Sequence, residues 1–330
     1  MEQRPQTWRE LLSSLSREER KRIVNALGIQ NKTMERWIHG QTGHPHPNRM
    51  RQLFKVLPAR TRALFIEFVQ QDPAFSHAAN MPLPGISTEI PSAFYSRVLE
   101  ANVSTSRSLR FTSICQLVLL QAVRQIDPDR LGLYMVILKC TPPAHGKKVQ
   151  SLCQYFSLGT LPWSTIVEQK SVFLGAESVV GQAVMTHRAF VFQDTQSDSD
   201  LDILSVYQSE HPASVVALPI QKNGRIAGCL LVLSTQPNFF TPNRLKIIQQ
   251  YCHLVVIAIE DDEWYEQQQI ELRLMPPLRV QQEYLAQFQK RVSTAIKQAH
   301  CDGHPKNWLE AEREVQQRIE AELLEEATSE

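Results

Sequence analysis

Polar side chains of the types that recognise nucleic-acid bases lie close together near the start of the chain. Gln30 and Asn31 carry amides that can pair bidentately with adenine, and Arg36 carries a guanidinium that can pair with guanine. Lys32 and Thr33 lie between them in the sequence. We predict that these five residues contact base edges in the major groove of double-stranded DNA.

Three basic residues farther along, Arg49, Arg51 and Lys55, suit a different role. Contacts to phosphates position a protein on DNA without carrying sequence information, and basic side chains commonly make them. We therefore expect these three residues to contact phosphates. The apolar residues Met34 and Trp37 are expected to lie in the core.

Charge is distributed unevenly along the chain, although the net charge is only +1. Residues 1–77 contain 13 Lys and Arg against 7 Asp and Glu, a net charge of +6. Residues 260–330 contain 8 against 16, a net charge of −8. This asymmetry indicates nucleic acid as the partner of the basic end, and protein or solvent at the acidic end.

The pattern around the basic residues predicts short helices joined by a tight turn. An apolar stripe over 8–15 indicates a first helix. Ser16 and Glu19 form a capping box that begins a second helix, and Gly28 ends it. Further helices are expected at about 32–39, ending at Gly40, and through 50–57. Two short helices joined in this way place the second in the major groove.

Residues 16–58 resemble the phage-repressor-like (Xre-type) helix-turn-helix family. The loop at 41–46 is longer than is usual in that family. The resemblance implies that the helix at 32–39 is a recognition helix; the alternative is a helical interaction module with a solvated basic face. The matching residues are Leu27, Gly28, Ile29, Thr33, Arg36, Trp37, Gly40, Pro47, Leu53 and Leu57.

The middle of the chain alternates strand-like and helix-like patterns. Asn223-Gly224 between two apolar runs is a strong hairpin signal, and Thr241-Pro242 begins an amphipathic helix that we expect to reach Ile259. These patterns predict an antiparallel sheet flanked by helices. The other expected elements are strands at 131–139, 151–158, 189–192, 215–221 and 226–234, and a helix at 180–184.

This ordered combination resembles the GAF domain family over about 94–262. The matching stretches are 175–194, 214–234 and 239–260. The resemblance implies a small-molecule pocket on one side of the sheet and dimerisation through the terminal helices. A pocket that has lost its ligand, leaving a role in folding and dimerisation, is an equal alternative.

No residue pattern identifies the effector. Bilin-binding relatives attach their chromophore through a cysteine near the hairpin, and 201–212 contains none. The cyclic-nucleotide signature of other relatives is also missing. Core packing explains Cys252 of the Cys252-His253 pair, and His187 and His211 are isolated histidines without a metal-ligand spacing. We therefore predict no cofactor, no metal and an unidentified effector.

The C-terminal region is helical by pattern, with breaks at 276–277 and 302–305. One stripe is formed by Leu285, Phe288, Val292 and Ile296, and a later one by Trp308, Val315, Ile319 and Leu323. We expect these helices to pack on the sensor domain or across a dimer. The acidic face that they carry is expected to be solvated or to dock a protein.

Taken together, the patterns predict an α+β protein with an all-α helix-turn-helix bundle at 1–75, a linker at 76–93, a GAF-like domain at 94–262 and a helical tail at 263–330. No phosphate-binding loop, dinucleotide fingerprint or nucleophile elbow occurs, so we predict no catalytic residues and no enzyme. The six cysteines lack a C-x-x-C pair and are expected to be free thiols, mostly in apolar runs.

The function we predict is that of a homodimeric transcriptional regulator. The first residues lack a secretory signal and no apolar run is long enough to span a bilayer, so we expect a cytoplasmic protein without membrane partners. Its two N-terminal regions would bind half-sites about one helical turn apart. The alternatives are a signalling adaptor that does not bind DNA and a structural dimer module.

Overall fold

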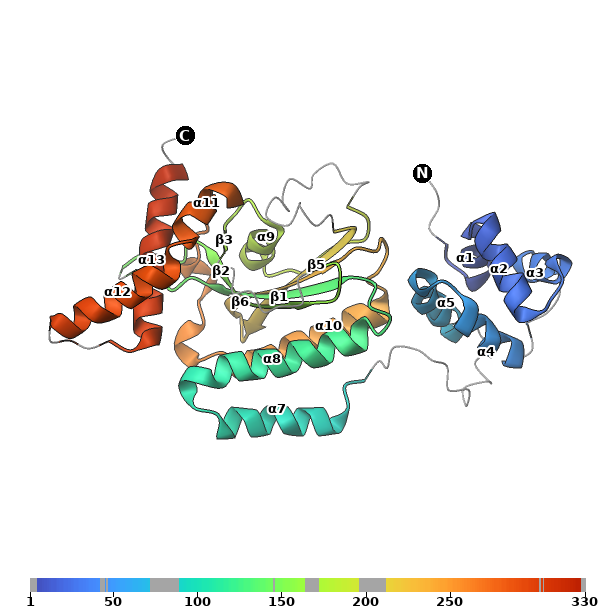
Figure 1. The fold of residues 1–330 in the computed structure, drawn as a ribbon, viewed down its shortest axis with the longest axis horizontal. Coiled ribbons are helices and arrows are strands. Elements are labelled where there is room, and N and C mark those ends of the chain that lie inside the picture. Colours follow the sequence, from blue (N-terminus) through green and yellow to red (C-terminus); the bar gives the residue numbers. More distant parts are fainter. Residues whose placement is uncertain are drawn as a thin grey trace. The chain divides into compact units, whose positions relative to one another are not determined.

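The computed structural model describes residues 5–41, 45, 47–71, 89–144, 146–163, 172–195, 212–302, 304 and 306–327. Part of the predicted linker and most of the loop at 41–46 lie outside these residues. The chain divides into two compact units, one of helices and one built around a β-sheet (Figure 1). The expectation of an α+β protein with helical ends is confirmed.

The N-terminal unit packs short helices around one apolar core. Phe65 lies at its centre, with its ring 6.0 Å from that of Trp8 and 5.6 Å from that of Phe54, both edge-on. The predicted helices are present, and α5 extends the bundle beyond them. The described helices are α1 (Trp8–Ser14), α2 (Arg17–Leu27), α3 (Asn31–Ile38), α4 (Pro47–Val56) and α5 (Ala59–Gln71).

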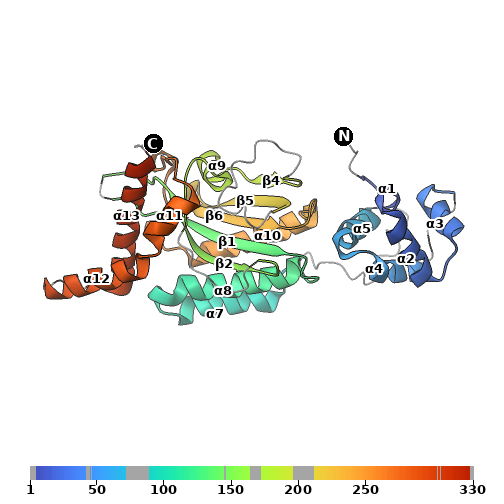
Figure 2. The same cartoon turned by 45° about the horizontal axis from the view of Figure 1, so that its top comes forward.

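The second unit contains an antiparallel sheet with the strand order β3-β2-β1-β6-β5-β4, of which Figure 2 shows the part from β2 to β4. The predicted hairpin joins β5 to β6, and its central residues Asn223 and Gly224 have φ of 52° and 78°. Both angles are those of a tight two-residue hairpin turn. The strands are β1 (Leu133–Cys140), β2 (Leu152–Gly159), β3 (Phe173–Leu174), β4 (Phe190–Phe192), β5 (Ser214–Lys222) and β6 (Arg225–Ser234).

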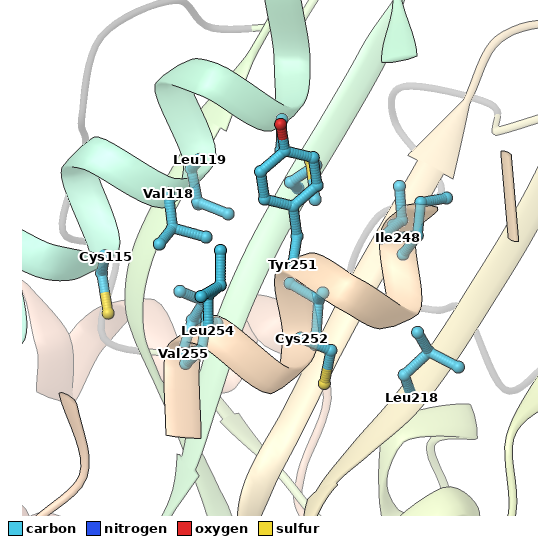
Figure 3. Close-up of a cluster of buried hydrophobic side chains, with 14 of the residues drawn as sticks. Cys115, Val118, Leu119, Leu218, Ile248, Tyr251, Cys252, Leu254 and Val255 are labelled. Carbon is cyan, nitrogen blue, oxygen red and sulfur yellow. The ribbon is translucent and has the colours of Figure 1, made fainter. Parts of the chain in front are cut away.

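Helices cover both faces of this sheet (Figure 1). Two of them, α8 and α10, pack on one face with side chains such as Val118 and Tyr251 (Figure 3), and α7 packs on α8. The opposite face carries α9. The helices are α7 (Ser92–Ser104), α8 (Arg107–Ile126), α9 (Val179–Thr186) and α10 (Pro242–Val255).

Both faces of β1 are buried, which explains its continuous apolar sequence. Met135 and Ile137 belong to the cluster under α8 and α10, whereas Val136 and Leu138 belong to the cluster under α9. Alternate residues of a strand point to opposite faces, so a strand covered on both sides needs apolar residues throughout. Lys139 is the polar exception on the α8 face.

The segment after α10 differs from the prediction. The α-helix ends at Val255 and not at Ile259, and residues up to 277 form short 3-10 turns and extended backbone in place of the helix predicted from 263. The Val149 N–H donates to the Gln269 carbonyl at 2.9 Å, and the Glu271 N–H donates to the Val149 carbonyl at 2.8 Å. Pairing with distant backbone replaces helical hydrogen bonds there.

The tail forms three helices, α11 (Leu278–Leu285), α12 (Phe288–Cys301) and α13 (Trp308–Ala327). The predicted stripe over 285–296 is divided by a break at 286–287. Val315, Ile319 and Leu323 pack against Cys153 of β2 and Phe173 of β3, so the expected packing on the sheet domain is confirmed. Trp308, in contrast, is 46% exposed and lies outside the buried stripe.

Among the described residues, no helix is both long and apolar enough to cross a bilayer.

Candidate functional site

Both ends of α2 are fixed by local interactions. The Ser16 hydroxyl accepts from the Glu19 N–H at 3.2 Å, and the Glu19 carboxylate accepts from the Ser16 N–H at 2.9 Å, as the capping box predicts. Gly28 ends α2 with φ of 60°, and an added Cβ there would meet no atom within 4 Å. Glycine is therefore favoured by backbone conformation and not by lack of space.

Helix α3 separates apolar from polar residues as predicted. Met34 and Trp37 are buried in the helical core. Gln30, Asn31, Lys32 and Arg36 are exposed, and Thr33 is half-buried. The structure thus brings the five predicted base-reading residues onto one short helix and its first flanking residue.

Arg49 has a structural partner that the sequence did not reveal. Its guanidinium Nη1 donates to the Leu27 carbonyl at 2.7 Å and to Gln52 Oε1 at 3.2 Å. The bond to Leu27 connects α4 to the end of α2, and the bond to Gln52 lies within α4, so Arg49 orients the two helices whether or not it contacts a phosphate. Arg51 and Lys55 lie on α4, but their side chains are outside the described part of the structure.

On the sheet domain, α9 approaches its neighbours very closely. The Ser178 hydroxyl caps α9 by accepting from the Gly181 N–H at 2.9 Å. A Cβ on Gly181 would lie 1.9 Å from the Gly175 carbonyl oxygen, so only glycine fits there. His187 ends the helix with φ of 57°. Residues 196–211, which include His211, lie outside the described residues.

The cysteines lack the environment of reactive thiolates. Cys115, Cys140, Cys153, Cys229 and Cys252 are buried, and Cys301 is exposed. Burial raises the pKa of both Cys140 and Cys252 to about 12, so these side chains stay neutral thiols. In the described part of the chain, no three His, Cys, Asp or Glu side chains are placed to hold a metal ion.

A buried polar network joins the tail to the sheet. Ser151 Oγ donates to Glu320 Oε1 at 2.5 Å and lies 2.7 Å from Thr141 Oγ1. The Tyr155 hydroxyl donates to Gln316 Oε1 at 2.9 Å. Burial raises the pKa of the Glu320 carboxyl from 4.5 to about 7, and the hydrogen bond from Ser151 offsets only part of that shift.

Comparison with known families assigns the sheet domain. The GAF domain family matches residues 110–259, which run from the first turn of α8 to the end of the 3-10 turn that follows α10. Residues 110–259 form a GAF domain. A GAF domain is a ligand-sensing or dimerisation module. Helix α7 precedes the matched residues, and the tail helices follow them, so both flank the GAF domain.

Solved GAF domain structures are similar to this chain at low identity. The GAF domain of an Acinetobacter phosphoenolpyruvate-protein phosphotransferase is 16% identical, covers 50% of this chain and 89% of its own, and has a TM-score of 0.37. The GAF domain region of a Geobacter sulfurreducens PCA membrane protein is 18% identical, covers 46% of this chain and 97% of its own, and has a TM-score of 0.36. The structure of fRMsr of Staphylococcus aureus, in complex with substrate, is 14% identical, covers 52% of this chain and 98% of its own, and has a TM-score of 0.35. A comparison with curated proteins finds no match.

Proposed function

We propose that the protein is a sequence-specific DNA-binding transcriptional regulator whose GAF domain senses a small ligand, mediates dimerisation, or does both. The observation that carries this proposal is the amphipathic character of α3. Met34 and Trp37 anchor the helix, and its exposed positions carry the Gln, Asn, Lys and Arg side chains that bind base edges.

The surroundings of α3 support the same role. Gly28 begins the tight turn that sets the direction of α3, and this helix-turn-helix arrangement is one that enters the major groove. The excess of basic residues in 1–77 adds a long-range attraction to phosphates. The comparison that assigns the GAF domain does not extend to these helices, so their role is our proposal.

Dimerisation is supported by an apolar stripe on α7. Tyr95, Leu99 and Val103 are 38%, 54% and 85% exposed, and their spacing of four residues places them on one helical face. Phe94 and Val98 hold the other face on the core. We propose that a second copy covers the stripe, which would pair two N-terminal units for half-sites about 34 Å apart, or a multiple of that.

A ligand of the GAF domain would regulate DNA binding through the dimer. It can shift the affinity for DNA only if it binds the competent and incompetent states of the dimer with different affinities. We further infer that the chain is not an enzyme, because its buried cysteines are neutral thiols and its sequence has no phosphate-binding loop, dinucleotide fingerprint or nucleophile elbow.

The test is retention of random genomic fragments by the full chain at two salt concentrations, followed by sequencing. We expect salt-sensitive retention of a shared, roughly palindromic sequence. Lys32→Ala with Arg36→Ala should weaken that retention by at least about 30-fold, since two side-chain contacts to bases at about 1–3 kcal/mol each amount to about 2 kcal/mol or more.

A matched control carries Lys246→Ala and Lys297→Ala, which remove two exposed charges from the other unit. It should bind as the unchanged protein does, and circular dichroism should show both variants folded. Equal retention by the two double variants, or no retention at low salt, would favour the adaptor function.

A further inference from the structure

A cavity of about 630 Å³ lies between the GAF domain and the tail. Its walls come from the start of α8, from β1 and β2, from residues 260–263, and from the first turns of α13. It therefore lies on the face of the sheet that α8 covers, opposite to α9. The volume falls in the range of small-molecule sites, about 300–1,000 Å³.

Carboxylates outnumber basic groups in the walls. Lys139 pairs with Glu263, and Arg107 pairs with Glu260 at 3.4 Å and with Asp262 at 3.5 Å. Glu310 and Glu312 of α13 remain, with Arg313 as the other basic residue in the walls. An excess of negative charge in a partly enclosed site concentrates cations.

The two carboxylates of α13 can receive a cation without losing their present roles. Glu310 accepts the Asn307 N–H at 3.1 Å through one oxygen, Oε2. Glu312 is half-buried, and burial raises the pKa of its carboxyl because charge there is poorly solvated, while a hydrogen bond with the Trp308 side chain offsets part of that shift. A bound cation would stabilise both in their ionised form.

Aromatic rings in the same cavity already hold an ammonium group. The rings of Phe111 and Tyr155 lie 5.9 Å apart at 77°. Lys139 Nζ lies 4.4 Å from the centre of the first ring and 4.8 Å from that of the second. The placement of Lys139 over these rings and beside Glu263 shows that this wall suits an alkylammonium group.

The spread of the carboxylates distinguishes an organic cation from a metal ion. No three His, Cys, Asp or Glu side chains of the described residues converge on one point where a metal could bind. An elongated ligand with several separated amines matches charges spread along a wall, and its methylene groups match the half-exposed Leu309.

We propose that this cavity binds a linear organic polyamine, with its ammonium groups on Glu310 and Glu312 and its carbon chain over Leu309. Because the walls come from both the GAF domain and α13, the ligand would favour the docked tail. The proposal rests on the ligand-sensing part of the proposed function and does not require DNA binding.

Calorimetric titration of the full chain with spermidine at about 150 mM NaCl tests the proposal, since that salt screens exposed charges beyond about 8 Å. We expect saturable binding, weakened at least tenfold by Glu310→Gln with Glu312→Gln. A glutamine at position 310 keeps a side-chain oxygen that can accept the hydrogen bond from the Asn307 N–H. The control Glu266→Gln with Glu283→Gln removes two exposed carboxylates elsewhere and should bind normally.

A second variant, Leu309→Arg, places a positive side chain at a half-exposed wall position and should abolish binding while the melting temperature stays unchanged. Butanedioate, a dianion of similar length to a diamine, should not bind. The proposal is wrong if spermidine shows no saturable binding, if both Gln double variants weaken it equally, or if butanedioate binds as tightly. Retention of DNA fragments, measured separately, tests the proposed DNA binding and does not depend on whether spermidine binds.

Discussion

Glu320 is a residue whose charge state the fold alters strongly. It belongs to a helix that is mostly acidic on its surface, yet it lies buried between α13 and the sheet with Ser151 as its hydrogen-bond donor. Its pKa of about 7 in the folded protein is above the 4.5 of a solvated glutamate. The folded state therefore holds this proton more tightly than the unfolded state does.

The sign of the pH dependence follows directly. The stabilisation from the neutral carboxyl is fully present below pH 4.5 and is lost as the pH rises to about 7. Glu320→Gln keeps an acceptor for Ser151 without the charge, so it should raise the free energy of unfolding by up to about 3 kcal/mol at alkaline pH and change it little in acid. Urea denaturation at about pH 5 and pH 8 measures this. An equal change at both pH values, or the same effect from Glu283→Gln, would contradict it.

Thiol reactivity is a second test at the residue scale. Of the six cysteines, only Cys301 is exposed. A maleimide should label about one thiol in the native protein and all six after denaturation. Cys301→Ser should remove the native reaction, whereas Cys252→Ser should leave it intact. Rapid native labelling of several thiols would show that the buried clusters open.

At the scale of elements, the docking of α13 depends on its apolar stripe. Ile319 is fully buried with Val315 and Leu323 against the outer strands of the sheet. Ile319→Ala should lower the free energy of unfolding by about 2–5 kcal/mol, because it leaves a cavity. Leu309→Ala, at a position 49% exposed on the same helix, should change it by less than about 0.5 kcal/mol. Urea denaturation compares them, and equal effects would mean that the helix is not docked in solution.

At the scale of the whole molecule, self-association tests the exposed stripe of α7. Leu99→Asp with Val103→Asp should convert a dimer to a monomer at micromolar concentration in analytical ultracentrifugation, since a charge buried at an interface is strongly unfavourable. Ser96→Asp with Arg97→Asp changes charge on other exposed positions of the helix and should leave a dimer. A monomer before any substitution would overturn the proposed pairing of DNA-binding units.

Features that depend on neighbouring residues were predictable. The capping box of Ser16 and Glu19, the stop at Gly28 and the hairpin at Asn223-Gly224 are all formed within a few residues, so their patterns are visible in the sequence. The exposed face of α3 followed from the buried spacing of Met34 and Trp37. The candidate DNA-contacting residues were located in this way.

Features that depend on distant partners were not predictable. The segment at 260–277 avoids a helix because Val149 and Ile226 offer it backbone partners. Lys139 and Glu320 are buried only because Glu263 and Ser151 meet them across the fold.

The sequence by itself therefore determined the N-terminal helices, the main strands and their hairpin, the local caps and turns, and the apolar faces that must be buried. Only the tertiary structure decided which elements cover those faces, which polar groups are buried in pairs, and where a charged cavity forms between α8 and α13. The physical reason is the separation in sequence between the interacting residues. Local hydrogen bonds and periodic burial involve residues only a few positions apart, whereas a cavity exists only when segments far apart in the sequence pack together.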